Sequence, residues 1–161
     1  MKLPLQLCAG LIVLGAFGAV APAQTPAVAP AVASAPASAS ALTVENAWVR
    51  VTPGADVAAA YMTLRNRGAR PLVVIGVQSA LAGHAMIHES KLEGGQSTMR
   101  AVERLVVPAG ASVKLAPGGL HVMLQMLAHT PAVGEAVPLV LQLQGGATVS
   151  VSARVHPLAA D

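Results

Sequence analysis

The chain has 161 residues, which is enough for one ordinary domain, and 54% of them are hydrophobic, a fraction that alanine inflates. Its formal charge of +3 is scattered along the sequence, and only three residues are aromatic. Nucleic-acid binding would require a basic face or stacking aromatic side chains, so the composition argues against it. The sequence also lacks a Ser/His/Asp set, a carboxylate pair in a motif and a phosphate-binding loop, so we do not expect an enzyme.

The first residues have the pattern of an export signal. Lys2 supplies a positive charge, residues 3–20 are largely apolar, and residues 21–23 supply small side chains at a cleavage point. We therefore predict a signal peptide over residues 1–23 and a periplasmic protein with no stable membrane insertion after cleavage. The alternative is a retained anchor, but an apolar run of roughly 18 residues only approaches the ~20 that a span needs, and no charged stop-transfer flank follows it.

Cys8 is the one cysteine of the sequence. A lipoprotein acceptor is one interpretation, but Leu7 before it is not small and the position is very early. We therefore interpret Cys8 as part of the signal core, which is lost on processing. The mature chain then has no cysteine, which excludes disulfides, thiolate catalysis and Cys-based zinc sites.

The mature chain is expected to begin with a linker and continue into a single domain. Residues 24–42 are dominated by Ala, Pro and Ser and carry no charge, which predicts a flexible linker. The folded domain is expected over residues 43–157, with a short C-terminal tail over residues 158–161.

The domain reads as a series of strands. Short runs rich in Val, Thr and Leu alternate with Gly and Pro at roughly ten-residue spacing, which is typical of strands. The expected strands cover residues 42–51, 57–65, 72–77, 84–89, 98–103, 105–107, 112–115, 120–127, 137–144 and 148–155. No convincing amphipathic helix is visible, and so many short strands in ~115 residues predict an all-β antiparallel sandwich.

Four residues with metal-binding side chains stand out by their spacing. Ten residues separate His88 from Met99. Twenty-one separate Met99 from His121, and one separates His121 from Met123. His121 and Met123 lie two apart on one expected strand, so their side chains project to the same face. Met86 precedes His88 by two and shares its face, which makes it an accessory or alternative ligand.

The expected hairpin around residue 94 would bring two of these residues together. A turn between Glu93 and Gly94 would place His88 directly opposite Met99, with Cβ atoms about 4.5–5.5 Å apart. A bulge at Gly94 and Gly95 would shift this register.

The chemistry of the four side chains favours monovalent copper. Thioether sulfur is soft and suits Cu(I), while imidazole suits several transition metals. A His₂Met₂ set has no thiolate, so a blue-copper electron-transfer centre is not expected. Zinc prefers Cys, His and carboxylates, and calcium and magnesium require oxygen clusters. The donors are neutral, so a Cu(I) complex keeps a charge of +1, which suits transfer better than redox turnover.

Structural explanations compete with this hypothesis for each residue taken alone. Methionine in a sandwich is usually core filler, and a histidine on a strand is usually an exposed or satisfied polar residue. We assign Met62 and Met126 to packing on this basis. Trp48 and Tyr61 are expected as core anchors.

The spacing His-x10-Met-x21-His-x-Met resembles the motif of the periplasmic copper chaperones called PCuAC. The sequences AWVRVTPGADVAAAYMTLRN, MIHES and VPAGASVKLAPGGLHVMLQML also resemble that family, and the resemblance covers about residues 43–155. It implies a cupredoxin-like β-sandwich that binds Cu(I) through His88, Met99, His121 and Met123. It also implies delivery to the copper-A centre of cytochrome c oxidase, directly or through a thioredoxin-like copper assembly protein.

Two other functions remain open from the sequence. One is a periplasmic copper scavenger for tolerance or supply, without an oxidase target. The other is a metal-free exported sandwich used in adhesion or assembly, in which the His and Met positions are chance.

Overall fold

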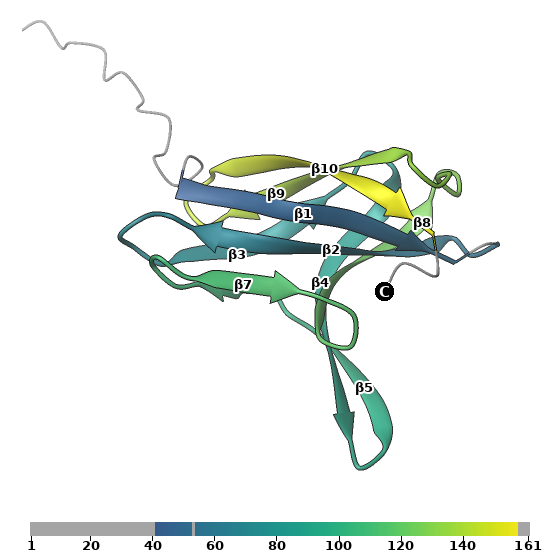
Figure 1. The fold of residues 1–161 in the computed structure, drawn as a ribbon, viewed down its shortest axis with the longest axis horizontal. Coiled ribbons are helices and arrows are strands. Elements are labelled where there is room, and N and C mark those ends of the chain that lie inside the picture. The colour runs from purple at the N-terminus through teal and green to yellow at the C-terminus, as the bar shows by residue number, and fades with distance from the viewer. Residues whose placement is uncertain (1–40, 53, 158–161) are drawn as a thin grey trace, which may run out of the picture. The chain divides into compact units, whose positions relative to one another are not determined.

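The computed structural model describes residues 41–52 and 54–157. These residues form ten strands (Figure 1): β1 (Leu42–Val51), β2 (Val57–Asn66), β3 (Leu72–Gln78), β4 (Ala82–Glu93), β5 (Gln96–Ala101), β6 (Leu105–Val107), β7 (Ser112–Leu115), β8 (Leu120–Leu127), β9 (Ala136–Leu143) and β10 (Thr148–His156). The predicted signal peptide with Cys8, nearly all of the linker and the tail lie outside the described residues.

The strands join in one mixed sheet in the order β5-β4-β8-β2-β1-β10-β9-β3-β6, while β7 pairs with β2. β2 pairs with β8 along its first half and with β7 along its second half. Every neighbouring pair is antiparallel except β1 and β10, where Trp48 lies beside Arg154 in a parallel ladder. The predicted all-β class is confirmed, and the parallel pair makes the sheet mixed.

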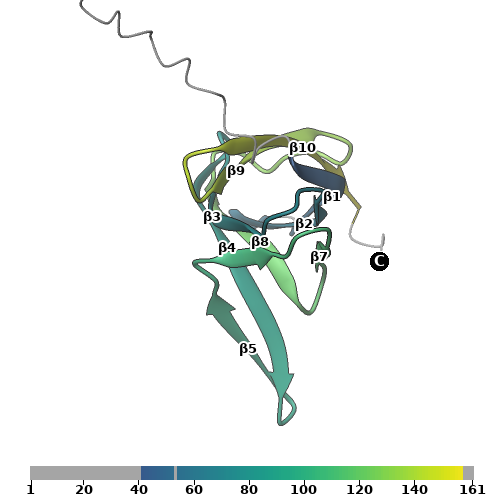
Figure 2. The ribbon, with the colours of Figure 1, turned by 90° about the vertical axis from the view of Figure 1, so that its left-hand side faces the viewer.

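The sheet folds over on itself around one hydrophobic core. Side chains of β8 and β9, from distant positions in the strand order, meet in the same buried cluster, which includes Val122, Leu124, Leu139 and Leu141. Figure 2 shows β9 and β10 on one side of the domain and β2, β4 and β8 on the other. Successive strand residues alternate between the two faces of a sheet. The residues next to the buried ones on β4 and β8 therefore lie on the outer face.

The β4–β5 hairpin extends from the rest of the domain as a two-stranded ribbon (Figures 1 and 2). Its turn is formed by Gly94 and Gly95, with φ of 60° and 82°, as a two-residue type I′ connection requires. Glu93 therefore pairs with Gln96, and Ser90 lies opposite Met99. The prediction that His88 lies directly opposite Met99 is wrong, because the turn sits one residue later than expected and shifts every partner by two.

Asn66, at the end of β2, is the fully buried polar residue that closes the turn to β3. Its Nδ2 donates hydrogen bonds to the carbonyl oxygens of Arg70 at 2.8 Å and Val107 at 3.0 Å. Its Oδ1 accepts one from the Gly68 amide at 2.9 Å. The side chain of Asn66 thus satisfies backbone groups of the β2–β3 turn and also of β6, which lies about forty residues later in the sequence.

Within the described part of the chain, no helix has the length and apolar character needed to cross a membrane.

Candidate metal centre

The two expected histidines lie on neighbouring strands. In the β4–β8 ladder His88 is the direct cross-strand partner of His121, and Met86 is the partner of Met123. Between them, Ile87 and Val122 point the other way and are buried in the core, 4% and 0% exposed. Direct partners share a face, with Cβ atoms about 4.5–5.5 Å apart. Two histidines and two methionines therefore project together from the outer face.

Met99 joins this group from β5. Its partner Ser90 lies two residues from His88 on β4, so Met99 and His88 share a face despite the shifted register. They are diagonal neighbours, a relation that spans about 7–8 Å and is within reach of long side chains. We call this outer surface the His–Met face; its residues are Met86, His88, Met99, His121 and Met123.

His121 is held in a defined orientation. It is 6% exposed, and its Nδ1 lies 3.0 Å from the carbonyl oxygen of Gly119. A carbonyl can only accept, so Nδ1 is the donor in this contact, and in the neutral form of the ring the lone pair lies on Nε2. Metal-binding histidines are commonly oriented in this way by a hydrogen bond from the second ring nitrogen. The Pro117-Gly118-Gly119 turn that precedes β8 supplies this carbonyl.

His88 has a buried nitrogen with no protein partner. Its Nδ1 makes no hydrogen bond within the described residues, although such buried groups are normally satisfied. The ring stands edge-on to His121, with centroids 6.0 Å apart. Burial lowers the pKa of His88, and the neighbouring His121 lowers it further. Both effects favour a neutral imidazole, which is the form that binds metals.

The three thioethers differ in exposure. Met86 and Met99 are 43% and 50% exposed, whereas Met123 is half-buried. The sulfur of Met123 lies 3.4 Å from Nε2 of Gln125, a weak contact that orients it. Methionine side chains usually fill gaps in a hydrophobic core, but Met86 and Met99 lie at the surface and do not pack there. Met86 and Met99 are therefore reachable from solvent.

Aromatic rings border the face on the side of β2. Tyr61 lies next to His121, with ring centroids 6.4 Å apart. Trp48 follows on β1, 4.5 Å from Tyr61, and it stacks on His156 at 5.3 Å. Trp48 is half-buried and its side chain is not in the core cluster, so its predicted role as a core anchor is wrong. Tyr61 is buried but belongs to the same outer row.

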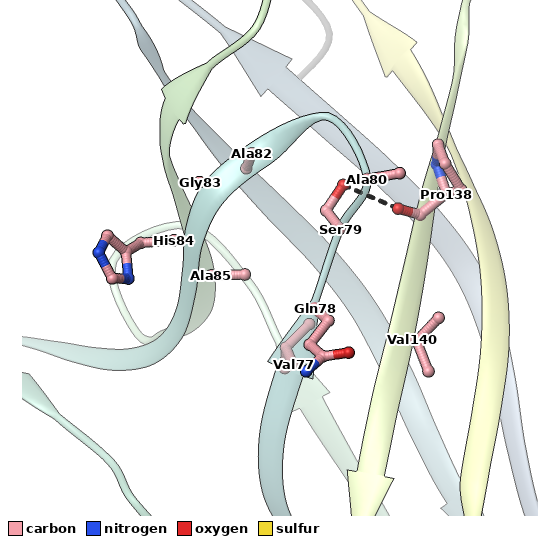
Figure 3. A pocket seen from close by; sticks show the side chains of 10 residues that line it. All are labelled: Val77, Gln78, Ser79, Ala80, Ala82, Gly83, His84, Ala85, Pro138 and Val140. Atoms are coloured by element: carbon pink, nitrogen blue, oxygen red, sulfur yellow. Dashed lines mark hydrogen bonds between the residues drawn. The ribbon is translucent and has the colours of Figure 1, made fainter.

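The remaining histidines belong to other surroundings. His84 continues the row of Met86 and His88 on β4, opposite Gln125. It also borders a hollow of about 630 Å³ between the β3–β4 connection and β9. In Figure 3 the imidazole of His84 points away from Ser79 and Pro138, which line the other side of that hollow. None of the four expected ligands lines it.

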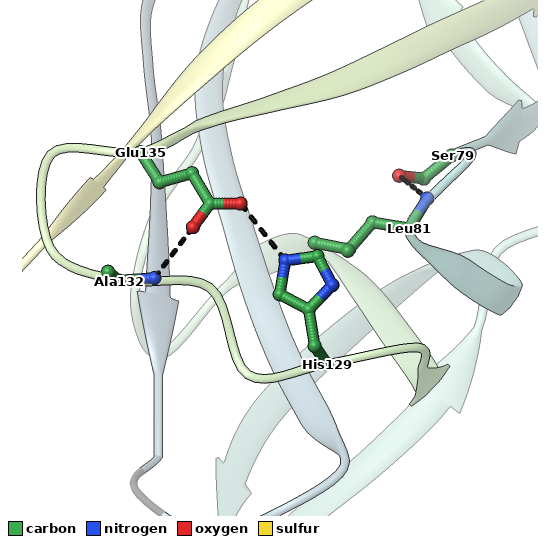
Figure 4. A network of polar contacts seen from close by, with 5 residues as sticks. All are labelled: Ser79, Leu81, His129, Ala132 and Glu135. Atoms are coloured by element: carbon green, nitrogen blue, oxygen red, sulfur yellow. Dashed lines mark hydrogen bonds and ion pairs between the residues drawn. The ribbon is translucent and has the colours of Figure 1, made fainter.

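His129 lies in a surface network of the β8–β9 loop. Its Nε2 is 3.1 Å from Oε1 of Glu135, and Oε2 of Glu135 accepts a hydrogen bond from the Ala132 amide at 2.9 Å (Figure 4). The Ala132 amide, and then His129, lower the pKa of this carboxyl group. His129 is thus engaged outside the His–Met face.

A metal at the two paired histidines would need sulfur to complete its ligand set. Among residues 41–52 and 54–157, no three His, Cys, Asp or Glu side chains are grouped closely enough to hold an ion. The neighbours of His88 and His121 on their face that carry a sulfur donor are Met86, Met99 and Met123. Two imidazoles with thioethers form a soft, neutral set that suits Cu(I).

Two features of the centre were missed from the sequence, which carries a signal for only the second of them. The Gly119 carbonyl acts on His121 through a turn, and Gln125 acts on Met123 through a side-chain contact. Alternation alone places Gln125 on the face of Met123, so that residue could have been a candidate.

Comparison with known proteins adds independent observations. A family model described as "Putative lipoprotein LpqE-like" matches residues 42–155. "Putative lipoprotein Lxx21020" of Leifsonia xyli subsp. xyli is 33% identical over 113 residues, which cover 70% of this chain and 68% of the relative.

Solved structures also resemble the chain. The "Copper-bound PCuAC domain from PmoF2" matches with a TM-score of 0.61 and 27% identity, over 72% of this chain and 92% of that domain. The solution structure of the Cu(I) form of DR1885 from Deinococcus radiodurans matches with a TM-score of 0.58 and 34% identity, over 87% of this chain and 96% of that protein. Both are named for a copper-bound state.

Proposed function

The chain belongs to the LpqE-like family, and from its His–Met face and its similarity to PCuAC domains we propose that it is a copper chaperone. It binds one Cu(I) ion as cargo through His88, Met99, His121 and Met123. It is a carrier and not an enzyme.

One observation carries this proposal. His88 and His121 are direct cross-strand partners, and Met99 and Met123 project from the same face beside them. Residues with up to 34 others between them in the sequence, from His88 to Met123, are thereby gathered on three adjacent strands. The buried Nδ1 of His88, which has no hydrogen-bond partner among the described residues, supports a metal-binding role for this ring.

The donor set suits a carrier. Nδ1 of His121 is engaged with Gly119, which leaves Nε2 to bind, and the lowered pKa of His88 keeps its ring available. Imidazole and thioether are neutral, so the ion is held without charge neutralisation. A partner that offers thiolates, which are stronger ligands for Cu(I), can then remove it. The half-exposed thioethers leave room for such a partner to approach.

We propose that the protein acts in the periplasm and delivers copper to the copper-A centre of cytochrome c oxidase, directly or through a thioredoxin-like copper assembly protein. Export is supported by the apolar N-terminal sequence and by the lipoprotein names of the matching family and relative. Intact mass of the mature protein distinguishes cleavage before Gln24 from lipid attachment at Cys8.

Anaerobic titration with Cu(I) tests the binding proposal. The wild type should take up one equivalent, and Met123→Ala should bind more weakly. Met126→Ala is the matched control, because Met126 is a 54% exposed methionine of the same strand outside the His–Met face. Absence of stoichiometric binding by the wild type, or equal affinity of Met123→Ala, would overturn the proposal.

Delivery is tested separately. The copper-loaded protein should transfer its ion to the apo copper-A domain of the oxidase or to the assembly protein, and deletion of the gene should lower oxidase copper content. Normal oxidase copper with loss of copper tolerance would favour a scavenger. An adhesion or assembly sandwich predicts no copper uptake and no effect of His88→Ala.

A further inference from the structure

We propose that Met86 is a fifth copper donor, so that the β4–β8 ladder alone carries a complete His₂Met₂ set, and that Met86 and Met99 replace each other on the ion during its transfer. This inference rests on the proposed function and concerns how the same site handles its cargo.

The register of β4 and β8 is the first argument. Met86 and His88 on β4 face Met123 and His121 on β8, each pair in direct cross-strand contact. Because the strands are antiparallel, the Met-x-His sequence of β4 opposes the His-x-Met sequence of β8, so each donor lies opposite a donor of the same kind. Neighbours along each strand are about 6.8 Å apart and neighbours across about 5 Å. Four donors thus form a compact group on two strands.

The position of Met99 is the second argument. It comes from β5, the edge strand of the extended ribbon, and all residues of β5 except Thr98 are exposed. Its approach to His88 is diagonal and depends on the ribbon keeping its position. Met86 is held differently, because its neighbour Ile87 is anchored in the core and its own strand is paired with β8. The two thioethers flank His88 along β4, Met86 on one side and Met99, opposite Ser90, on the other.

The exposure of Met86 is the third argument. Its side chain is 43% exposed, so it does not serve core packing. A thioether at the surface beside two metal-binding imidazoles is available to an ion held by them.

The exchange is chemically balanced. A bond forms between copper and the sulfur of Met86 as the bond to the sulfur of Met99 breaks. Copper stays monovalent, no proton moves and the charge of the complex remains +1. Departure of Met99 opens one side of the ion to an incoming ligand while the protein still supplies four donors.

Three variants test this inference: Met86→Leu, Met99→Leu and the double variant, with Met126→Leu as the control. Copper affinity is measured anaerobically by competition with a chromogenic Cu(I) chelator, and the number of sulfur donors by X-ray absorption at the copper edge. Leucine preserves the bulk of each side chain without its sulfur, and all three positions are exposed, so folding is not at risk.

Met99→Leu should keep two sulfur donors and lose affinity by no more than about tenfold, whereas the double variant should keep one sulfur and lose about a hundredfold or more. Met86→Leu should bind nearly normally at equilibrium and release copper to the chelator more slowly. If Met99→Leu has one sulfur donor and the affinity of the double variant, Met86 is not a donor and the inference is overturned. Failure of the wild type to bind Cu(I) would instead overturn the proposed function.

Discussion

Replacing Asn66 by leucine should destabilise the domain strongly and independently of copper. The change keeps the volume of the side chain and removes three hydrogen bonds, two donated to Arg70 and Val107 and one accepted from Gly68. The bond to the Val107 carbonyl is buried, and loss of a donor to a buried acceptor costs about 1–3 kcal/mol. The other two are partly buried, so water can replace them, and each contributes about 0.5–1.5 kcal/mol. The expected loss in the free energy of unfolding is therefore about 2–6 kcal/mol.

Urea unfolding followed by the fluorescence of Trp48 measures this loss on the metal-free protein. Thr43→Val is the matched control, because it removes a single exposed hydrogen bond to the Arg65 carbonyl at 3.3 Å, and it should cost no more than about 0.5 kcal/mol. A loss below about 1 kcal/mol for Asn66→Leu would refute the reasoning that these buried bonds hold the turn and β6 together.

Three further predictions concern the site and the core. Burial and the neighbouring His121 lower the pKa of His88, so the ring of His88 stays neutral below pH 6.5. The stability that His88 contributes is therefore fully present above pH 6.5 and is lost as the pH falls through the lowered pKa. Cu(I) affinity should accordingly hold from about pH 8 to 6.5 and fall below about pH 6, and constant affinity down to about pH 5 in a titration would contradict ligation by two histidines. Oxidation of Met99 and Met123 to sulfoxides, followed by mass spectrometry, should weaken Cu(I) binding, and full affinity after complete oxidation would argue against thioether ligation. Leu124→Ala, at a side chain with no exposure, should lower the free energy of unfolding by about 2–5 kcal/mol in urea titrations, and a loss under about 1 kcal/mol would mean that the core does not depend on it.

The strands could be predicted from the sequence because Pro and Gly mark their ends. The predicted limits of β1 and β8 agree with the structure, and those of β4 were too short because its ribbon continues through Lys91 and Leu92 without a breaking residue. The pairing of the strands, in contrast, could not be predicted from the sequence. Nothing in the local pattern indicates that β4 pairs with β8, because that contact is fixed by the burial of Ile87 and Val122 in the shared core.

The face on which the candidate ligands lie could be predicted, because side chains alternate between the two faces along a strand. The hairpin register was wrong by two positions, yet Met99 remains on the face of His88 because side chains repeat every two residues. A shift by one would have placed it on the opposite face. Trp48 was misassigned because an apolar aromatic residue on a strand can cover either face; here its neighbour Val49 is buried in the core, and Trp48 lies on the other face with Tyr61 and His156.

The parallel ladder between β1 and β10 has a consequence for how the domain is made. β10 sits in the middle of the strand order, so a chain that stops before residue 148 leaves β5-β4-β8-β2-β1 and β9-β3-β6 as two separate sheets. The first and last strands must find each other across the whole domain, which is a slow, long-range step. The three strands of the His–Met face remain neighbours in the first of these sheets, so the step that waits for β10 is the closure of the shared core over Ile87 and Val122, and not the pairing of β4 with β8.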